Sequence, residues 1–334
     1  MTEDEKDIKK AAEIIKDGGI VAFPTETVYG LGANAFCDEA VKQIFVAKGR
    51  PSDNPLIVHV SDKEMIDELV SEKTYMAKVL IDNFMPGPVT VIMKKNERVG
   101  DIVTAGLDTV AVRFPENKTA QALIRFSGVP VAAPSANLSG KPSPTEARHV
   151  VEDMSGRIPC IITGGACEAG VESTVIDATG DVPVILRPGI ITKEDIEKVL
   201  PEVLVDSHVL KSVGASDKPK SPGMKYKHYA PKADVTVVEG ESSKVKKKID
   251  ELLKQNTDKK CGVLVSSDNS YDADFVFLAG KDNIEYSHNL FTMLREFDEA
   301  GADIIFAELT VEDKYALAVK NRIYKAAGNK VIFV

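Results

Sequence analysis

The sequence lacks several features that would place it in a specialised class of proteins. Its four cysteines, Cys37, Cys160, Cys167 and Cys261, include no C-x-x-C pair of the kind that holds zinc, so we expect reduced thiols. The N-terminus MTEDEKDIKK contains no apolar segment of a signal peptide, and no apolar run approaches the ~18 residues of a membrane span. We therefore expect a cytoplasmic protein that has no membrane partner.

A basic excess and the common nucleotide motifs are missing too. The formal net charge is −9 at pH 7, whereas a dedicated nucleic-acid-binding protein usually carries surplus Lys and Arg to neutralise phosphates. No G-x-x-x-x-G-K-[ST] motif occurs, which excludes a P-loop NTPase, and GLGA lacks the third glycine of a dinucleotide-binding fingerprint. These absences leave room for a local basic pocket within an acidic protein.

Length and patterning predict two α/β domains. The chain has 334 residues, of which 43% are hydrophobic and 28% charged, enough for two ordinary cores. Over residues 1–205, buried runs typical of strands occur at 20–23, 56–60, 89–93, 109–114, 129–133, 158–163, 173–177 and 183–187. Because the last two leave no room for a helix between them, we expect a mixed sheet in this first domain.

Residues 206–233 form an expected linker between the two domains. The stretch from Ser207 to Lys232 has no periodicity and carries six lysines against one aspartate. Beyond it, apolar runs at 235–240, 261–267, 274–280, 303–309 and 331–334 alternate with helical stretches. This rhythm predicts a smaller, Rossmann-like domain over 234–334 with a parallel sheet.

PTETVYGLG, residues 24–32, follows the first expected strand directly. Ligands of open α/β sheets bind at the carboxyl ends of strands, and this loop offers polar side chains there, namely Thr25, Glu26, Thr27 and Tyr29. Gly30 and Gly32 would let a ligand approach the backbone closely. A loop with a purely structural role explains the same residues equally well.

AKGRPSDNPLIVHV, residues 47–60, brings several polar groups to one turn. Asp38 can cap a helix that ends at Lys48, and a glycine and two prolines then force the chain to turn. A rigid turn lowers the entropy cost of presenting Arg50 and Asn54 together, and Arg and Lys suit phosphate or carboxylate. The alternative is that these cations only interact with the dipole at the helix end.

Polar residues also occur within or beside other expected strands. His59 lies between two valines, where a histidine is more often a hydrogen-bonded core residue than a ligand. Arg113 has apolar neighbours, and burying its guanidinium is costly unless an anion meets it. Ser173 begins an expected strand, and Arg187 ends one just before a turn.

APSANLSGKPSPT, residues 133–145, follows a strand end and is rich in small polar groups. Hydroxyls, an amide and backbone N–H groups of this kind can cradle phosphates and ribose without net charge. The side chains in question are Ser135, Asn137, Ser139 and Ser143.

SPGMKYKHYAP, residues 221–231, interleaves aromatic side chains with lysines. The aromatic residues are Tyr226, His228 and Tyr229. A lid that closes over a nucleotide and a solvated tether explain this composition equally well.

Taken together, PTETVYGLG, KGRP with NPL and H, SANLSG, STV and RPG, in this order, closely resemble the L-threonylcarbamoyladenylate synthase family. Its YrdC-like catalytic domain would cover about residues 6–204, and the linker and C-terminal domain resemble the long, two-domain form. The resemblance implies an open, twisted α/β sheet with a concave positive pocket. It also implies synthesis of threonylcarbamoyl-AMP from L-threonine, bicarbonate and ATP, with release of pyrophosphate, for threonylcarbamoyladenosine in tRNA.

The resemblance also implies roles for individual residues. L-threonine would be held by Thr27, His59, Arg113, the backbone around Ala133, and Ser173. ATP would be held by Arg50, Asn54, Thr109, Ser135, Ser143 and Arg187, with Asn137 and Lys48 beside the phosphates and Tyr226 or Tyr229 completing the site. Lys48 and Arg50 would do the catalytic work, because N-carboxythreonine and the α-phosphate of ATP are both anions.

No metal site of the protein's own is expected, and Mg²⁺ would bridge the ATP phosphates. A tRNA-modifying threonylcarbamoyl transferase would take the product, and no stable nucleic-acid binding is expected. Two other kinds of protein share some of these features. The hydrogenase-maturation carbamoyltransferases contain a similar domain but also zinc-finger cysteine pairs, which this chain lacks. A double-stranded RNA-binding module fits poorly with the acidic net charge.

Overall fold

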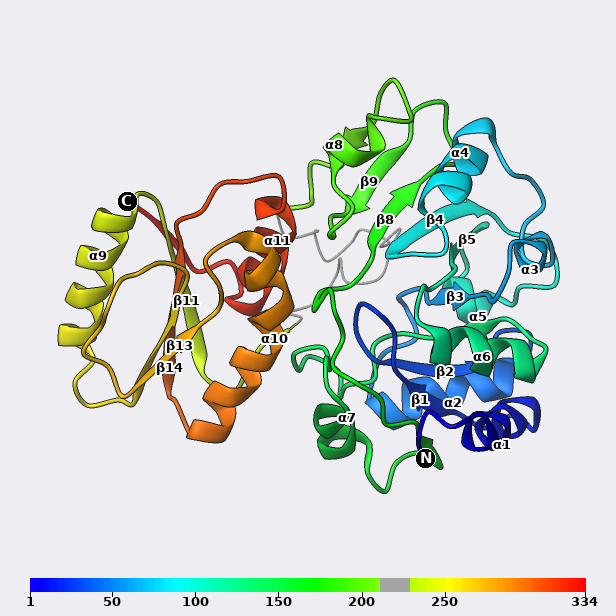
Figure 1. Cartoon of the computed structure of the whole chain (residues 1–334), viewed down its shortest axis with the longest axis horizontal. Helices are drawn as coiled ribbons and strands as arrows, with labels where there is room; N and C mark the ends of the chain where they lie inside the picture. The colour runs from blue at the N-terminus through cyan, green and yellow to red at the C-terminus, as the bar shows by residue number, and fades with distance from the viewer. Residues whose placement is uncertain (211–228) are drawn as a thin grey trace. The chain divides into compact units, whose positions relative to one another are not determined.

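The computed structural model describes residues 1–210 and 229–334 (Figure 1). Two compact units are present, one formed by Met1–Ser139, Ser143–Glu168 and Glu172–Lys225, the other by Gly140–Pro142, Ala169–Val171 and Tyr226–Val334. Most of the expected linker, including Tyr226, lies outside the described residues. No described helix is long and apolar enough to cross a membrane.

The larger unit is built on one mixed sheet. Its strands are β1 (Val21–Phe23), β2 (Gly30–Asn34), β3 (Ile57–His59), β4 (Val89–Lys94), β5 (Thr109–Arg113), β6 (Val131–Ala132), β7 (Cys160–Ile161), β8 (Thr174–Asp177), β9 (Val184–Arg187) and β10 (Leu204–Val205). They lie in the order β10-β9-β8-β4-β5-β3-β6-β2-β1-β7. β3 pairs with β5 in parallel, whereas β4 and β5 are antiparallel. The expected mixed sheet is confirmed.

Helices of this unit bury apolar stripes against the sheet. They are α1 (Glu5–Lys16), α2 (Asp38–Lys48), α3 (Glu64–Asp67), α4 (Tyr75–Phe84), α5 (Asp101–Thr104), α6 (Lys118–Ser127), α7 (Ala147–Met154) and α8 (Lys193–Ile196). In α1 the buried residues recur at helical spacing, and they are Ile8, Ala11, Ala12 and Ile15. α2 ends at Lys48 as expected, because Gly49 adopts the left-handed conformation with φ 61°.

The predicted cap of α2 was wrong by one position. The residue that caps the helix is Cys37, and its side chain makes no cap hydrogen bond. Asp38 is instead the first helical residue, where its carboxylate lies in the first turn. A negative charge there interacts favourably with the positive end of the helix dipole, so Asp38 still favours the start of α2.

β2 was not predicted, because its glycines were interpreted as a ligand-binding loop. A Cβ atom on Gly32 would lie 2.5 Å from Val131 Cγ1 and 2.8 Å from Phe23 Cε1. Glycine is therefore required at this position for packing within the sheet. Close approach of a ligand to Gly30 and Gly32, the reason given above for both glycines, stays a prediction.

The smaller unit has a purely parallel sheet, as expected. It contains β11 (Asp234–Glu239), β12 (Cys261–Val265), β13 (Phe275–Leu278), β14 (Ile304–Leu309) and β15 (Val331–Phe333), in the order β13-β12-β14-β11-β15. All four pairs of neighbouring strands in this order are parallel. Figure 1 shows α9 (Ser242–Gln255) on one face of this sheet, with α10 (Asn283–Ala300) and α11 (Ala316–Ala326) on the other.

Candidate active site

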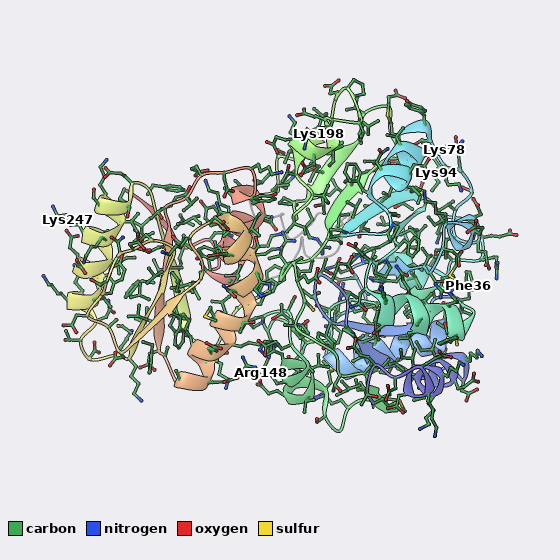
Figure 2. The ribbon with its side chains drawn as sticks, viewed as in Figure 1. Phe36, Lys78, Lys94, Arg148, Lys198 and Lys247 are labelled. Carbon is green, nitrogen blue, oxygen red and sulfur yellow. The ribbon has the colours of Figure 1, made fainter. Side chains whose placement is uncertain are left out.

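Three of the predicted site cations are buried. Lys48 is 3% exposed, and Arg113 and Arg187 are each 4% exposed. Figure 2 labels cations of the ordinary kind, such as Lys78, Lys94 and Lys198, which are exposed. Because burying a charge is costly unless partners compensate it, the contacts of the three buried cations define the candidate site.

Lys48 holds the 133–145 segment from the end of α2. Its Nζ donates to the carbonyl oxygens of Ser135 at 2.5 Å and Asn137 at 2.6 Å. The Ser135 hydroxyl in turn donates to Asn137 Oδ1 at 2.5 Å. Three residues that the family resemblance assigned to the ATP site, Lys48, Ser135 and Asn137, are thus brought together. Through these hydrogen bonds the ammonium of Lys48 fixes the shape of the loop and places a positive charge beside it.

Arg50 and Asn54 lie on the same turn, as predicted. Arg50 Nη2 donates to the carbonyl oxygens of Asn54 at 3.1 Å and Pro55 at 3.4 Å. The Asn54 side chain is only 1% exposed, and neither its Nδ2 nor its Oδ1 has a hydrogen-bond partner among the described residues. An unpaired buried amide costs about 1–3 kcal/mol, so this position is suited to a ligand that supplies polar groups.

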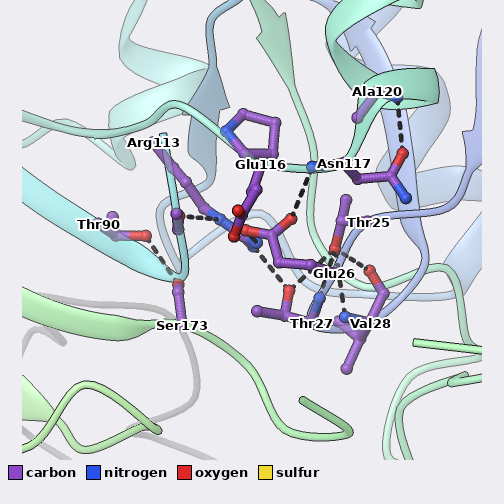
Figure 3. Close-up of polar contacts among 12 residues, drawn as sticks. Thr25, Glu26, Thr27, Val28, Thr90, Arg113, Glu116, Asn117, Ala120 and Ser173 are labelled. Atoms are coloured by element: carbon purple, nitrogen blue, oxygen red, sulfur yellow. Dashed lines mark hydrogen bonds and ion pairs between the residues drawn. The ribbon is translucent and has the colours of Figure 1, made fainter. Parts of the chain in front are cut away.

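Arg113 lies at the end of β5 among polar groups of the 24–32 segment. Figure 3 shows its guanidinium beside Glu26 and Thr27. Its Nη1 donates to Thr27 Oγ1 at 2.7 Å, and its Nη2 forms an ion pair with Glu26 Oε1 at 2.7 Å. Thr27 was a predicted site residue. Glu26 was noticed only as a carboxylate in the loop, because nothing local in the sequence indicates that Arg113 lies beside it.

His59 is buried on β3 as the direct register partner of Arg113 on β5. Burial, with the positive charge of Arg113 as the second cause, lowers the pKa of His59 to about 3. The imidazole is therefore neutral at physiological pH, and its Nδ1 has no hydrogen-bond partner in residues 1–210 and 229–334. A neutral ring with one unpaired nitrogen can accept a hydrogen bond from a ligand hydroxyl.

Arg187 and Ser173 are joined directly. Arg187, the last residue of β9, donates from Nε to the Ser173 carbonyl oxygen and from Nη2 to Ser173 Oγ, both at 3.1 Å. The Ser173 hydroxyl also lies 2.8 Å from the hydroxyl of Thr90 (Figure 3). The threonine and ATP sets predicted from the sequence therefore meet at Ser173. Thr90 was missed, because it lies inside an apolar strand and carries no separate signal.

The remaining predicted residues are more scattered. Ser143 donates to Glu172 Oε1 at 2.6 Å, and the amide of Ala133 donates to the Ile57 carbonyl at 2.8 Å. Thr109 begins β5, at the opposite end of the strand from Arg113.

Tyr229 belongs to the smaller unit, where its buried ring lies 5.0 Å from that of Phe291. It adopts a left-handed conformation, with φ 66°. Tyr226 falls outside the described residues. The choice between these two tyrosines as the nucleotide contact stays a prediction.

Comparison with known proteins identifies the family. Residues 13–189 match the family described as Telomere recombination (Sua5_yciO_yrdC), and residues 191–328 match the Threonylcarbamoyl-AMP synthase, C-terminal domain. The threonylcarbamoyl-AMP synthase of Pyrococcus abyssi is 52% identical over 334 residues, which cover 99% of this chain and 97% of the relative. That of Bacillus subtilis is 47% identical, with coverage of 99% and 96%.

The structural comparison agrees. The crystal structure of P. abyssi Sua5 complexed with L-threonine matches with a TM-score of 0.95 and 52% identity, over 99% of this chain and 97% of the other. The resemblance inferred from the sequence motifs is thereby confirmed along the whole chain. The protein belongs to the threonylcarbamoyl-AMP synthase family, in its two-domain form.

Proposed function

We propose that this chain makes threonylcarbamoyl-AMP from L-threonine, bicarbonate and ATP and releases pyrophosphate, as a precursor for threonylcarbamoyladenosine in tRNA. The observation that carries the proposal is that the larger unit contains both buried cations and buried polar atoms without a described hydrogen-bond partner. Lys48, Arg113 and Arg187 supply positive charge, and Asn54 and His59 present polar atoms that no group in the described part of the chain satisfies. A site of this kind suits two anionic substrates that must approach each other.

Threonine is assigned to the groups around Arg113. The guanidinium would bind the threonine carboxylate, and the neutral His59 would accept a hydrogen bond from the threonine hydroxyl at Nδ1. Thr27 and Ser173 would complete this subsite with the backbone at Ala133. Three of these side chains lie on or beside β3 and β5, because Thr27 contacts Arg113 and His59 is its register partner.

ATP is assigned to the loops that Lys48 and Arg187 stabilise. Arg50, Asn54, Ser135 and Asn137 would contact the phosphates and ribose. Thr109, Ser143, Arg187 and a linker tyrosine, Tyr226 or Tyr229, would contact the rest of the nucleotide. Since the Ser143 hydroxyl donates to Glu172, its lone pairs remain to accept a hydrogen bond from a base or ribose group.

Catalysis by these residues would be mainly positioning and electrostatic stabilisation. A carbamate oxygen of N-carboxythreonine forms the new bond to the α-phosphorus of ATP, and the bond to the pyrophosphate leaving group breaks. Lys48 and Arg50 would offset the repulsion between the two anions. No protein nucleophile takes part in this scheme.

Mg²⁺ is proposed as a companion of the ATP substrate. The described residues contain no group of three or more His, Cys, Asp or Glu side chains that could hold a metal ion. The ion would be held by the phosphates, where it neutralises charge. Reaction in the cytoplasm, and transfer of the product to a tRNA-modifying threonylcarbamoyl transferase, stay predictions.

Turnover measurements test the proposal. Pyrophosphate release should require ATP, L-threonine and bicarbonate together, and omission of each in turn should abolish it.

Arg50→Ala should reduce kcat/KM by about tenfold or more, since a lost hydrogen bond to a charged group costs about 1.5–3 kcal/mol. The matched control is Arg98→Ala, because Arg98 is an exposed arginine whose ion pair with Glu68 spans 2.8 Å. Near wild-type turnover by Arg50→Ala would contradict the pocket assignment. Strongly salt-dependent tRNA binding without turnover would instead favour the RNA-binding alternative.

A further inference from the structure

The guanidinium of Arg113 is held by three different groups of the protein. Nε donates to the Gly87 carbonyl at 3.4 Å, Nη1 donates to Thr27 Oγ1 at 2.7 Å, and Nη2 forms an ion pair with Glu26 Oε1 at 2.7 Å. Figure 3 shows two of these groups, Glu26 and Thr27, beside the arginine side chain. Of the three, Glu26 is the one that carries a charge opposite to that of Arg113.

The loop is folded so that two consecutive residues reach the same arginine. Thr25 Oγ1 accepts hydrogen bonds from the amides of Thr27 at 3.1 Å and Val28 at 3.3 Å. It also lies 2.9 Å from Thr27 Oγ1. This local turn fixes the backbone at Glu26, and thereby directs the carboxylate of Glu26 and the hydroxyl of Thr27 towards the same group.

The ion pair is almost completely buried. The side chains of Arg113 and Glu26 are 4% and 9% exposed. Glu26 Oε2 accepts from the amide of Asn117, the residue that caps α6, at 3.4 Å. Burial raises the pKa of Glu26, but the attraction of Arg113 and the hydrogen bonds outweigh burial and hold its pKa below the usual value. Glu26 is therefore an anion at physiological pH and supplies the countercharge of Arg113.

We propose that Glu26 is a positioning residue for threonine binding. It fixes the plane of the Arg113 guanidinium and carries its countercharge while the site is empty, so that an incoming carboxylate meets the guanidinium in one orientation. A buried arginine without that partner would turn towards other acceptors, and the carboxylate would then have to reorient it. This inference rests on the proposed role of Arg113 in holding threonine.

Substrate affinities measured separately test the inference. Glu26→Ala should raise the KM for L-threonine by about tenfold or more, whereas the KM for ATP should change by less than about twofold. A role in folding alone would affect both KM values together or neither. Asp82→Ala is the matched control, because Asp82 is an exposed carboxylate whose ion pair with Lys63 spans 2.7 Å, and it should leave both values unchanged.

Formate provides a second readout. The small anion can occupy the space left by the missing side chain in Glu26→Ala and pair with Arg113, so millimolar formate should lower the raised KM for threonine. In the wild type, formate should have no such effect. Formate that only inhibits the variant would overturn the inference, because it would then compete with threonine for an arginine that is already correctly placed.

A second variant covers the case in which Glu26→Ala does not fold. Glu26→Gln keeps an oxygen that can face Nη2 but removes the charge, and it should raise the KM for threonine by about threefold or more. A wild-type KM for threonine in folded Glu26→Gln would overturn the inference. Arg113→Ala separates this outcome from failure of the proposed function. If Arg113→Ala also leaves threonine affinity unchanged, the assignment of Arg113 itself is wrong.

Discussion

Replacing Lys48 with methionine would remove a buried ammonium and keep an unbranched side chain of similar length. Two of the hydrogen bonds from Lys48 Nζ, to the carbonyls of Ser135 and Asn137, are no longer than 2.6 Å. Hydrogen bonds to charged groups contribute about 1.5–3 kcal/mol each. Because these two share one donor, and because burial of the ammonium has its own cost, they do not add fully. We expect Lys48→Met to lower the free energy of unfolding by about 2–4 kcal/mol.

Calorimetry measures this loss in the transition of the larger unit. For a unit of this size, each kcal/mol corresponds to about 2–4 °C in Tm. The loop that contains Ser135 and Asn137 should also lose its fixed shape, so the KM for ATP should rise more than the KM for threonine. Lys42→Met is the matched control on the same helix. Lys42 is exposed and pairs with Glu39 at 2.5 Å, and such surface pairs contribute about 1 kcal/mol or less.

Two results obtained together would show that Lys48 is dispensable for the loop. If Lys48→Met and Lys42→Met agree in stability to within about 0.5 kcal/mol, and the KM for ATP is unchanged, the hydrogen bonds to the Ser135 and Asn137 carbonyls do not hold the loop. The nucleotide subsite would then need another source of rigidity.

Two more predictions concern buried polar groups. Asn54→Leu removes an unsatisfied amide, so Tm should stay the same or rise while the KM for ATP rises about tenfold; a lower Tm with an unchanged KM would refute this. The folded pKa of His59, about 3, lies below its unfolded value of ~6.5. The unfolded state then binds more protons between these values, so stability should fall as pH drops from ~6.5 towards 3, by up to ~1.4 kcal/mol per pH unit. His59→Asn should flatten that slope, and an unchanged slope in pH-dependent calorimetry would count against the neutral histidine.

Local sequence patterns predicted much of the fold, because many strands and helix ends are determined by residues that are near neighbours in the chain. The buried runs that became β4 and β5 are continuous and apolar, and the end of α2 follows from one glycine. β2 could not be recognised in this way. The need for Gly32 arises from Phe23 and Val131, and the second of these is distant in sequence and lies beside Gly32 only after the sheet forms.

Prediction of the candidate site from the sequence is limited in the same way, because some of its residues matter only through contacts that are distant in sequence. Resemblance of motifs selected Arg113, Thr27, Ser173 and Arg187, and the structure brings them into the contacts described above. Residues that act through these side chains were not selected. Thr90 lies in an apolar strand, and the relevance of Glu26 depends on an ion pair between residues far apart in the chain. Such partners are determined by tertiary contacts, which no local pattern contains.

The contact between Arg187 and Ser173 has a thermodynamic consequence. The Ser173 hydroxyl, which is assigned to threonine, accepts a hydrogen bond from Arg187, which is assigned to ATP. If ATP changes how Arg187 holds Ser173, it changes the affinity for threonine, and threonine must then change the affinity for ATP by the same factor. The free energy of binding both substrates would differ from the sum of the two measured alone. Variants of Ser173 would alter that coupling as well as either affinity.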